Sequence, residues 1–409
     1  MDANHIVQVA IDMVATHGFD KLTLRDLAQA VGKSTTVIVN LFGSKSGLLL
    51  ALGEAALAQD AAFHADFFGQ TNDLRADRDR LLTLLMRYLR LRASPSAGFA
   101  RVWEALLLAA EPDDARRDLM RRWEALRESA WRDCLTASEH PQAARLAAPL
   151  TLCLAMEQFY AGALLDRTDY ELICAEGFAA MVDRAFGLEE RPATATFWYR
   201  NRLVLPRAPA ETLDPDSIQR RLLDVAADQI MSAGPSQVTS RSVSLAAGTS
   251  TSTIVYHWPD MRRFLIDAVW HAVFRDMPRY LAGRNRAVQP GVATTESWLG
   301  IMAPTLSITP AAEGFYVRYA RLIASICVQA RLDPGLQDLA MLLRGPEGGG
   351  TFYNQEGVWP SSFDLTRLAA TRFALWIKGR SLVAAATAAP VSGDELTTTA
   401  DLLIARVAA

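Results

Sequence analysis

Residues 34–42 read STTVIVNLF, and residues 250–258 read STSTIVYHW, 216 positions further along the chain. Placing the second half under the first at this offset gives an ungapped match from Gly18 to Phe42, with nine identities in 25 positions. The identities include two glycine pairs, Gly18 with Gly234 and Gly32 with Gly248. Similarity between any two amphipathic helices does not keep turn glycines and core positions together. The pattern therefore predicts a tandem duplication of one folded unit.

The spacing of apolar residues predicts an all-α fold. Apolar side chains recur every three or four residues almost everywhere, and alternating strand-like runs are few. Residues 3–17 form one such amphipathic stretch, which Gly18 should end. Thr23 is placed to cap a short helix over residues 24–31, and Gly32 suits a tight turn with positive φ. Ser34 or Thr35 then caps a second short helix that ends near Leu41, so the order is helix-turn-helix.

The length, charge and cysteine spacing of the chain exclude several classes of protein. The 409 residues exceed one ordinary core, so two or more domains are expected. The net charge of -3 excludes a globally basic nucleic-acid coat but permits a local DNA-binding face. No secretory signal or membrane span is evident, and the four cysteines stand singly, without metal-ligand spacing. We expect a cytoplasmic protein with reduced, buried thiols, no metal and no cofactor.

One family resemblance is specific. Residues 17–49, HGFDKLTLRDLAQAVGKSTTVIVNLFGSKSGLL, resemble the N-terminal DNA-binding domain of the tetracycline-repressor (TetR) family of bacterial transcription regulators. Residues 233–265, AGPSQVTSRSVSLAAGTSTSTIVYHWPDMRRFL, resemble a second, more diverged copy. The resemblance implies that three helices of each copy bind DNA and that the other helices form a ligand-binding and dimerisation domain. Members of the family usually act as homodimeric repressors that a small molecule releases.

The resemblance also implies which residues face DNA bases or phosphates. The first copy supplies Thr23, Arg25, Thr35, Thr36, Val37, Asn40, Leu41 and Lys45, and the second supplies Thr239, Arg241, Thr251, Ser252, Thr253, Tyr256 and His257. Met261 replaces the lysine found at position 45, so Arg262 or Arg263 is the candidate substitute. Val39 and Val255 stand where the family often has tyrosine. Residues 18–47 and 234–263 each carry a net charge of +2, which favours contact with phosphates.

The duplication suggests a division of the chain. We expect helix-turn-helix domains at 1–47 and 216–263, helical ligand-binding or dimerisation domains at 48–187 and 264–409, and a linker at 188–215. The linker contains four prolines, which favour extended backbone: Pro192, Pro206, Pro209 and Pro215.

The two halves are expected to pair with each other. Residues 145–187 and 365–407 should form a four-helix bundle between them, so that one chain is a pseudo-dimer. Because Asn40 and Leu41 differ from Tyr256 and His257, the operator should be imperfect or asymmetric.

Aromatic residues between the DNA-binding and terminal segments are candidates for a ligand pocket, because pockets in helical bundles are mostly apolar. A small apolar or aromatic inducer is expected. Each of these side chains could equally belong to the core. The candidates are Trp103, Trp123, Trp131, Phe159, Tyr160, Trp298, Tyr316 and Tyr319.

Two further segments allow alternatives. Residues 344–362 contain five glycines, which favours either a flexible loop or a lid over a pocket. Residues 115–133 carry six arginines, but acids four residues ahead of several of them indicate a solvated, ion-paired face. No catalytic motif is present, so we expect no enzyme. The leading function is a repressor with two DNA readers. The alternative is a regulator whose second helix-turn-helix is structural or binds another protein.

Overall fold

The computed structural model describes residues 3–18, 22–71, 74–109, 113–204, 212–235, 238–287, 293–309 and 313–407. The described residues are helical except for loops and one antiparallel pair of two-residue strands, β1 (Phe363–Asp364) and β2 (Ala405–Arg406). The predicted all-α class is confirmed. Lys21 and Asp20, which enter the predicted local charge, lie outside the described residues, as do Pro206 and Pro209 of the linker.

The first half begins with three helices that we call the first unit: α1 (Ala3–His17), α2 (Leu24–Ala30) and α3 (Thr35–Phe42). The helices that follow are α4 (Lys45–Gly69), α5 (Arg78–Ala93), α6 (Gly98–Leu108), α7 (Asp114–Thr136), the 3₁₀ helix η2 (Pro141–Leu146), α8 (Ala147–Leu164) and α9 (Thr168–Phe186).

The linker is not wholly extended, contrary to prediction. A helix, α10 (Thr194–Arg202), occupies its middle. The helix itself contains no proline, and Pro192 lies two residues before its start. The Glu176 carboxylate accepts hydrogen bonds from the backbone N–H of Ala195 at 2.6 Å and of Thr196 at 2.9 Å. These bonds satisfy two of the donors that a helix start leaves unpaired, so a residue of α9 stabilises the helix.

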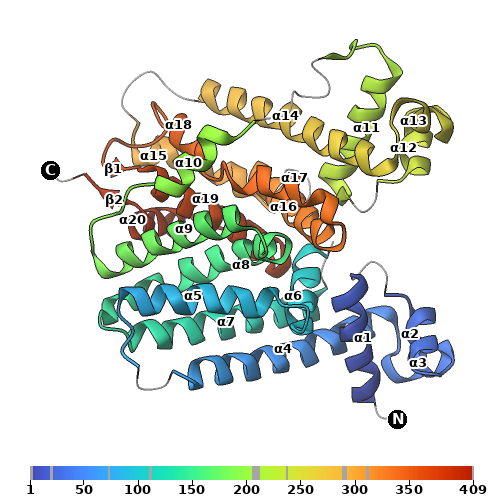
Figure 1. Ribbon diagram of the computed structural model, residues 1–409, viewed down its shortest axis with the longest axis horizontal. Helices are drawn as coiled ribbons and strands as arrows, with labels where there is room; N and C mark the ends of the chain where they lie inside the picture. The colour runs from blue at the N-terminus through green and yellow to red at the C-terminus, as the bar shows by residue number, and fades with distance from the viewer. Residues whose placement is uncertain are drawn as a thin grey trace.

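The second half begins with the second unit: α11 (Ile218–Ala233), α12 (Ser240–Ala246) and α13 (Thr251–His257). The remaining elements are α14 (Met261–Ala287), α15 (Thr295–Met302), η5 (Ala303–Leu306), α16 (Phe315–Leu332), η6 (Pro334–Leu336), α17 (Gln337–Arg344), α18 (Gly349–Tyr353), α19 (Arg367–Thr387) and α20 (Gly393–Leu403). Helices α12, α13 and α14 start 216 positions after α2, α3 and α4. Both units lie at the same end of the molecule, at the right of Figure 1.

The two halves share one interface. Helix α8 packs on α19 and α16, and α9 packs on α19 and α20. A Cβ added at Gly379 would lie 1.9 Å from the carbonyl oxygen of Leu152, so α19 and α8 cross where only glycine fits. Arg184 of α9 donates to the carbonyl oxygens of Asp401 and Leu402 at 2.8 and 3.0 Å. The terminal helices of both halves therefore form one packed core (Figure 1).

The segment 344–362 is partly helical and partly buried, so it is not the flexible loop that was predicted, whereas its role as a lid stays a prediction. Arg344 is buried and places its Nε 2.9 Å from Oε1 of Glu157, which is also buried. Glu347 accepts from Lys378 of α19 at 2.5 Å and from the Tyr160 hydroxyl of α8 at 3.0 Å. Two buried charges thus hold this segment between helices of opposite halves.

All four thiols are free and mostly buried. Burial raises the pKa of Cys134 to about 11 and also raises the pKa values of the other three thiols, so little thiolate forms at neutral pH. We expect Ellman's reagent at pH 7.5 to leave the folded protein unlabelled and to label all four thiols in urea. Rapid labelling of the folded protein would contradict the burial described here.

No single helix in the described ranges is long and apolar enough to cross a membrane. The joined pair α3 and α4 reaches the required length and composition, with a bend of 68° between them.

Candidate nucleic-acid interface and buried polar cluster

The first unit is built by a cap, a glycine turn and a small core. The Thr23 hydroxyl accepts from the backbone N–H of Asp26 at 3.1 Å and so caps α2. Gly32 has φ +64°, a conformation that other residues rarely adopt, and it joins α2 to α3. The side chain of Ile38, on the inner face of α3, is fully buried and packs this helix against the rest of the unit. The remaining faces of α3 are therefore free to point outward.

The second unit repeats these devices. Thr239 caps α12 by accepting from the backbone N–H of Ser242 at 3.0 Å, and Gly248 has φ +65°. Ile254 is buried under α13, as Ile38 is under α3. The same local chemistry thus shapes both helix-turn-helix units.

The predicted DNA-facing residues of the first unit share an exposed position. Leu41 is 50% exposed and Val37 36%. The polar candidates are exposed too: Thr23, Arg25, Thr35, Thr36, Asn40 and Lys45. This surface combines hydrogen-bonding groups, apolar groups and two cations, the mixture that reads base edges and phosphates.

The second unit presents a similar but less open surface. Tyr256 is 84% exposed, and Thr251, Ser252, Thr239 and Arg241 are exposed as well. His257 and Thr253 are half-buried. The hydroxyl of Thr253 lies 2.7 Å from that of Thr249 in the preceding turn.

Arg262, the candidate substitute for Lys45, is half-exposed and forms an ion pair within the chain. Its Nε lies 3.4 Å from the carboxylate of Asp333, which follows α16. A Cβ added at Gly335 would overlap the Arg262 guanidinium, so the side chain lies against η6. Arg263 pairs with Asp267 at 3.1 Å. Both candidate substitutes for the lysine are thus more than half exposed and take part in ion pairs, and their contact with a phosphate stays a prediction.

The structure has a cavity of about 830 Å³ beneath the second unit. It lies between α11, α13, the start of α14 and α17, next to the linker. None of the eight aromatic residues predicted for a ligand pocket lines it. The lining residues are Val204, Thr212, Leu213, Gln219, Leu223, His257, Trp258, Pro259, Arg263, Ile266, Asp267, Trp270, Gly335, Asp338, Leu339 and Leu342.

The predicted ligand aromatics lie in the core instead. Trp298 packs against Trp359 with ring centroids 5.1 Å apart. Tyr319 is half-buried beneath the Lys378 ammonium, 5.1 Å from the ring centroid, and Tyr316 is half-buried on the same helix. The others are fully buried: Trp103, Trp123, Trp131, Phe159 and Tyr160.

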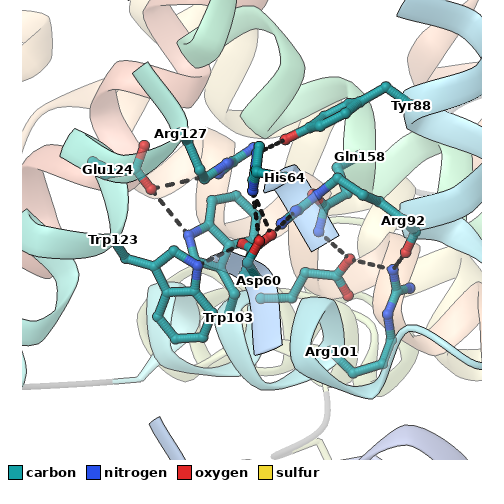
Figure 2. Close-up of polar contacts among 11 residues, drawn as sticks. Asp60, His64, Tyr88, Arg92, Arg101, Trp103, Trp123, Glu124, Arg127 and Gln158 are labelled. Carbon is teal, nitrogen blue, oxygen red and sulfur yellow. Dashed lines mark hydrogen bonds and ion pairs between the residues drawn. The ribbon is translucent and has the colours of Figure 1, made fainter. Parts of the chain in front are cut away.

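Trp103 and Trp123 belong to a group of mostly buried polar side chains that was not predicted from the sequence (Figure 2). The Trp123 indole donates to Asp60 at 2.6 Å, and the Trp103 indole donates to Glu124 at 3.0 Å. Asp60 also accepts from Arg92 at 2.5 Å. We call this group the buried polar cluster, and its members are Asp60, His64, Tyr88, Arg92, Arg101, Trp103, Glu104, Trp123, Glu124, Arg127, Gln158 and Arg331.

The charges of the cluster are strongly coupled. Burial alone would raise the pKa of Asp60, but Arg92 and His64 outweigh burial and hold that pKa well below its usual range. Burial raises the pKa of Glu104 and lowers that of Arg101, although the two form an ion pair at 3.0 Å. Charged groups at this depth are costly unless each is paired and hydrogen-bonded.

A sequence signal for this cluster existed in the helical phase of α4. Leu52, Ala56, Asp60 and His64 follow one another at four-residue spacing and are all buried. Two polar residues therefore continue an apolar stripe.

Arg127 requires a correction to the prediction for the arginine-rich helix, which was expected to be a solvated face. Arg127 is fully buried, with its guanidinium 4.0 Å from the Trp103 ring centroid.

Comparison with known families agrees with the geometry of the first unit. Residues 6–52, from α1 into α4, match the family described as bacterial regulatory proteins, tetR family. No curated protein matches the chain. The match covers a region whose recognition helix is anchored and exposed as DNA contact requires, although the expected side-chain cap by Ser34 is not formed. Residues 6–52 therefore form a DNA-binding domain of the tetR type, which makes this chain a DNA-binding transcription regulator.

Proposed function

We propose that the chain is a repressor whose two units read two unequal halves of one operator, and that a small-molecule effector releases it. The observation that supports this most directly is the position of the units. Both present an exposed recognition helix, and both lie at the same end of the molecule (Figure 1). A two-fold dimer places its recognition helices in this way to enter successive major grooves.

The interface between the halves supports a pseudo-dimer within one chain. Helices α8 and α9 meet α19 and α20, and the Arg344–Glu157 pair is buried between the halves. Because a covalent linker joins the halves, they meet at a high effective concentration. Sedimentation should therefore show one chain on each operator duplex, and obligate two-chain complexes would contradict this proposal.

The two recognition helices should prefer different bases. Asn40 and Leu41 end α3, whereas Tyr256 and His257 end α13. An asparagine amide can pair with an adenine edge, but a tyrosine ring offers a bulky apolar face and one hydroxyl. We therefore propose an imperfect operator. Footprints over a strict palindrome would contradict it.

Two matched arginines provide the first test. Arg25 and Arg241 are exposed at the starts of α2 and α12. Replacing either by alanine should weaken binding to a duplex selected from random DNA by the wild-type chain about 10- to 100-fold, since such contacts contribute about 1–3 kcal/mol. Gel shifts measure this, with Arg132→Ala in α7 as a surface control. If neither substitution changes affinity, the proposal fails for this face.

A second candidate function has its own support. In it, the second unit is structural or binds another protein and does not read DNA. Met261 replaces a lysine, Arg262 is paired with Asp333, and Thr253 is bonded to Thr249. Loss of DNA affinity with Arg25→Ala alone, and none with Arg241→Ala, would favour this function.

A further inference from the structure

The buried polar cluster contains more hydrogen-bond donors than the protein uses. Arg92, Arg101 and Arg127 are each at most 3% exposed. The atoms without a partner are Nη2 of Arg92, Nε and Nη1 of Arg101, and Nε and Nη2 of Arg127. Nε of Arg331 also lacks a partner, whereas Oε2 of Glu124 is the cluster's one acceptor without a partner among the described residues. Buried donors are nearly always satisfied in folded proteins, so this excess of donors calls for a further acceptor.

The net charge of the cluster indicates that this acceptor is negatively charged. Its four guanidinium groups, from Arg92, Arg101, Arg127 and Arg331, face only three carboxylates, from Asp60, Glu104 and Glu124. Helices α4 to α8 contribute three guanidiniums and three carboxylates, so the excess positive charge comes from Arg331 of α16, whose side chain is 19% exposed. A single negative charge would neutralise it.

We propose that this cluster binds a small monocarboxylate, which is the effector of the regulator. The proposal rests on the proposed function, because it names the chemistry of the effector. It adds a negative charge to the small apolar or aromatic inducer that was predicted. Guanidinium groups match a planar carboxylate with paired N–H donors. Trp103 and Trp123 are fully buried here, so an aromatic acid would contact their rings only after the cluster opens.

Gly162 of α8 lets two guanidinium groups pack closely against the helix at one edge of the cluster. A Cβ there would lie 2.9 Å from Nη1 of Arg101 and 3.1 Å from Nη1 of Arg331. Both guanidiniums also bind the Glu104 carboxylate, at 3.0 and 2.7 Å. Arg331 is 19% exposed, so this edge reaches solvent. A carboxylate entering beside Gly162 would compete with Glu104 for two arginines.

Helix α16 connects this edge to both units. Arg331 lies on α16 beside Leu332, whose Cδ1 would be 3.3 Å from a Cβ at Gly18, where α1 ends. Ser325 of α16 lies similarly close to Gly234, where α11 ends. A carboxylate that draws Arg331 away from Glu104 would therefore act on the helix that touches both DNA-binding units. This gives the effector a route to the spacing of the recognition helices.

The experiment compares benzoate with benzamide, which has nearly the same shape and no charge. Thermal unfolding of the full chain should show that benzoate raises Tm and that benzamide does not. Arg331→Met and Arg101→Met should each weaken benzoate binding, followed by tryptophan fluorescence, about 10- to 100-fold. Arg321→Met is the matched control, since Arg321 lies on α16 and pairs with Glu313 at 2.7 Å. It should leave benzoate binding unchanged.

Three results would overturn the proposal. Benzoate, phenylacetate and acetate could all leave Tm unchanged, as they would if ordered water satisfied the donors. Benzamide could stabilise as well as benzoate does, or Arg321→Met could weaken binding as much as Arg331→Met. Gel shifts run in parallel separate this inference from the proposed function. A chain that binds DNA but no carboxylate loses only the effector assignment, and one that binds benzoate but no DNA loses only the repressor.

Discussion

Replacing Thr36 by glutamate should weaken DNA binding about 100-fold or more. Thr36 is exposed in the first turn of α3, where the proposed operator would lie. A carboxylate there would face phosphates, and like charges brought together in an interface cost several kcal/mol. The substitution should not harm the fold, because an acidic side chain is favourable at a helix N-terminus. Gel shifts against a duplex selected by the wild-type chain provide the measurement.

Ser252→Glu is the matched substitution in α13, at the corresponding exposed position. Equal losses from Thr36→Glu and Ser252→Glu would support two readers in one chain. Full affinity with Ser252→Glu would instead make the second unit structural. Thr83→Glu adds the same charge to the exposed face of α5 and should change affinity little.

Replacing Arg344 by methionine should lower the free energy of unfolding by about 3–5 kcal/mol, because it leaves the buried Glu157 carboxylate without its partner. Combining Arg344→Met with Glu157→Leu should recover most of that loss, since an apolar pair needs no compensation for burial. The midpoint of urea unfolding measures both effects.

An exposed ion pair serves as the control for this prediction. Arg122 pairs with Glu54 and Asp118 on the surface of α7, with its side chain 46% exposed. Arg122→Met should change stability by about 1 kcal/mol or less. A loss as large as that from Arg344→Met, or no recovery in the double variant, would show that the Arg344–Glu157 pair does not hold the halves together in the way described.

Local sequence chemistry predicted the helix-turn-helix elements closely. The expected helix at 3–17 is α1, and α2 ends at Ala30, one residue before the expected end. The positive φ expected at Gly32 is present. These features depend on neighbours within about ten residues, such as caps and turn glycines, and neighbours of that kind can be recognised in a sequence.

Contacts between distant segments could not be predicted in the same way. Five glycines made residues 344–362 look flexible, yet Glu157 and Lys378, far away in the chain, hold that segment in place. Helix α10 forms because Glu176 of α9 caps it. In both cases the deciding partner lies on another helix, and apolar periodicity gives no measure of which helices meet.

Helix α16 bears on how such a regulator can change. In a homodimer every substitution is present in both subunits, so both DNA-binding units change together. Here Leu332 approaches the end of α1 while Ser325 approaches the end of α11, and one helix carries both contacts. A mutation at one of these positions affects the unit that the residue contacts and leaves the other unit unchanged. If both units read DNA as proposed, selection can adjust the recognition of each half-site separately, although α16 contacts both units.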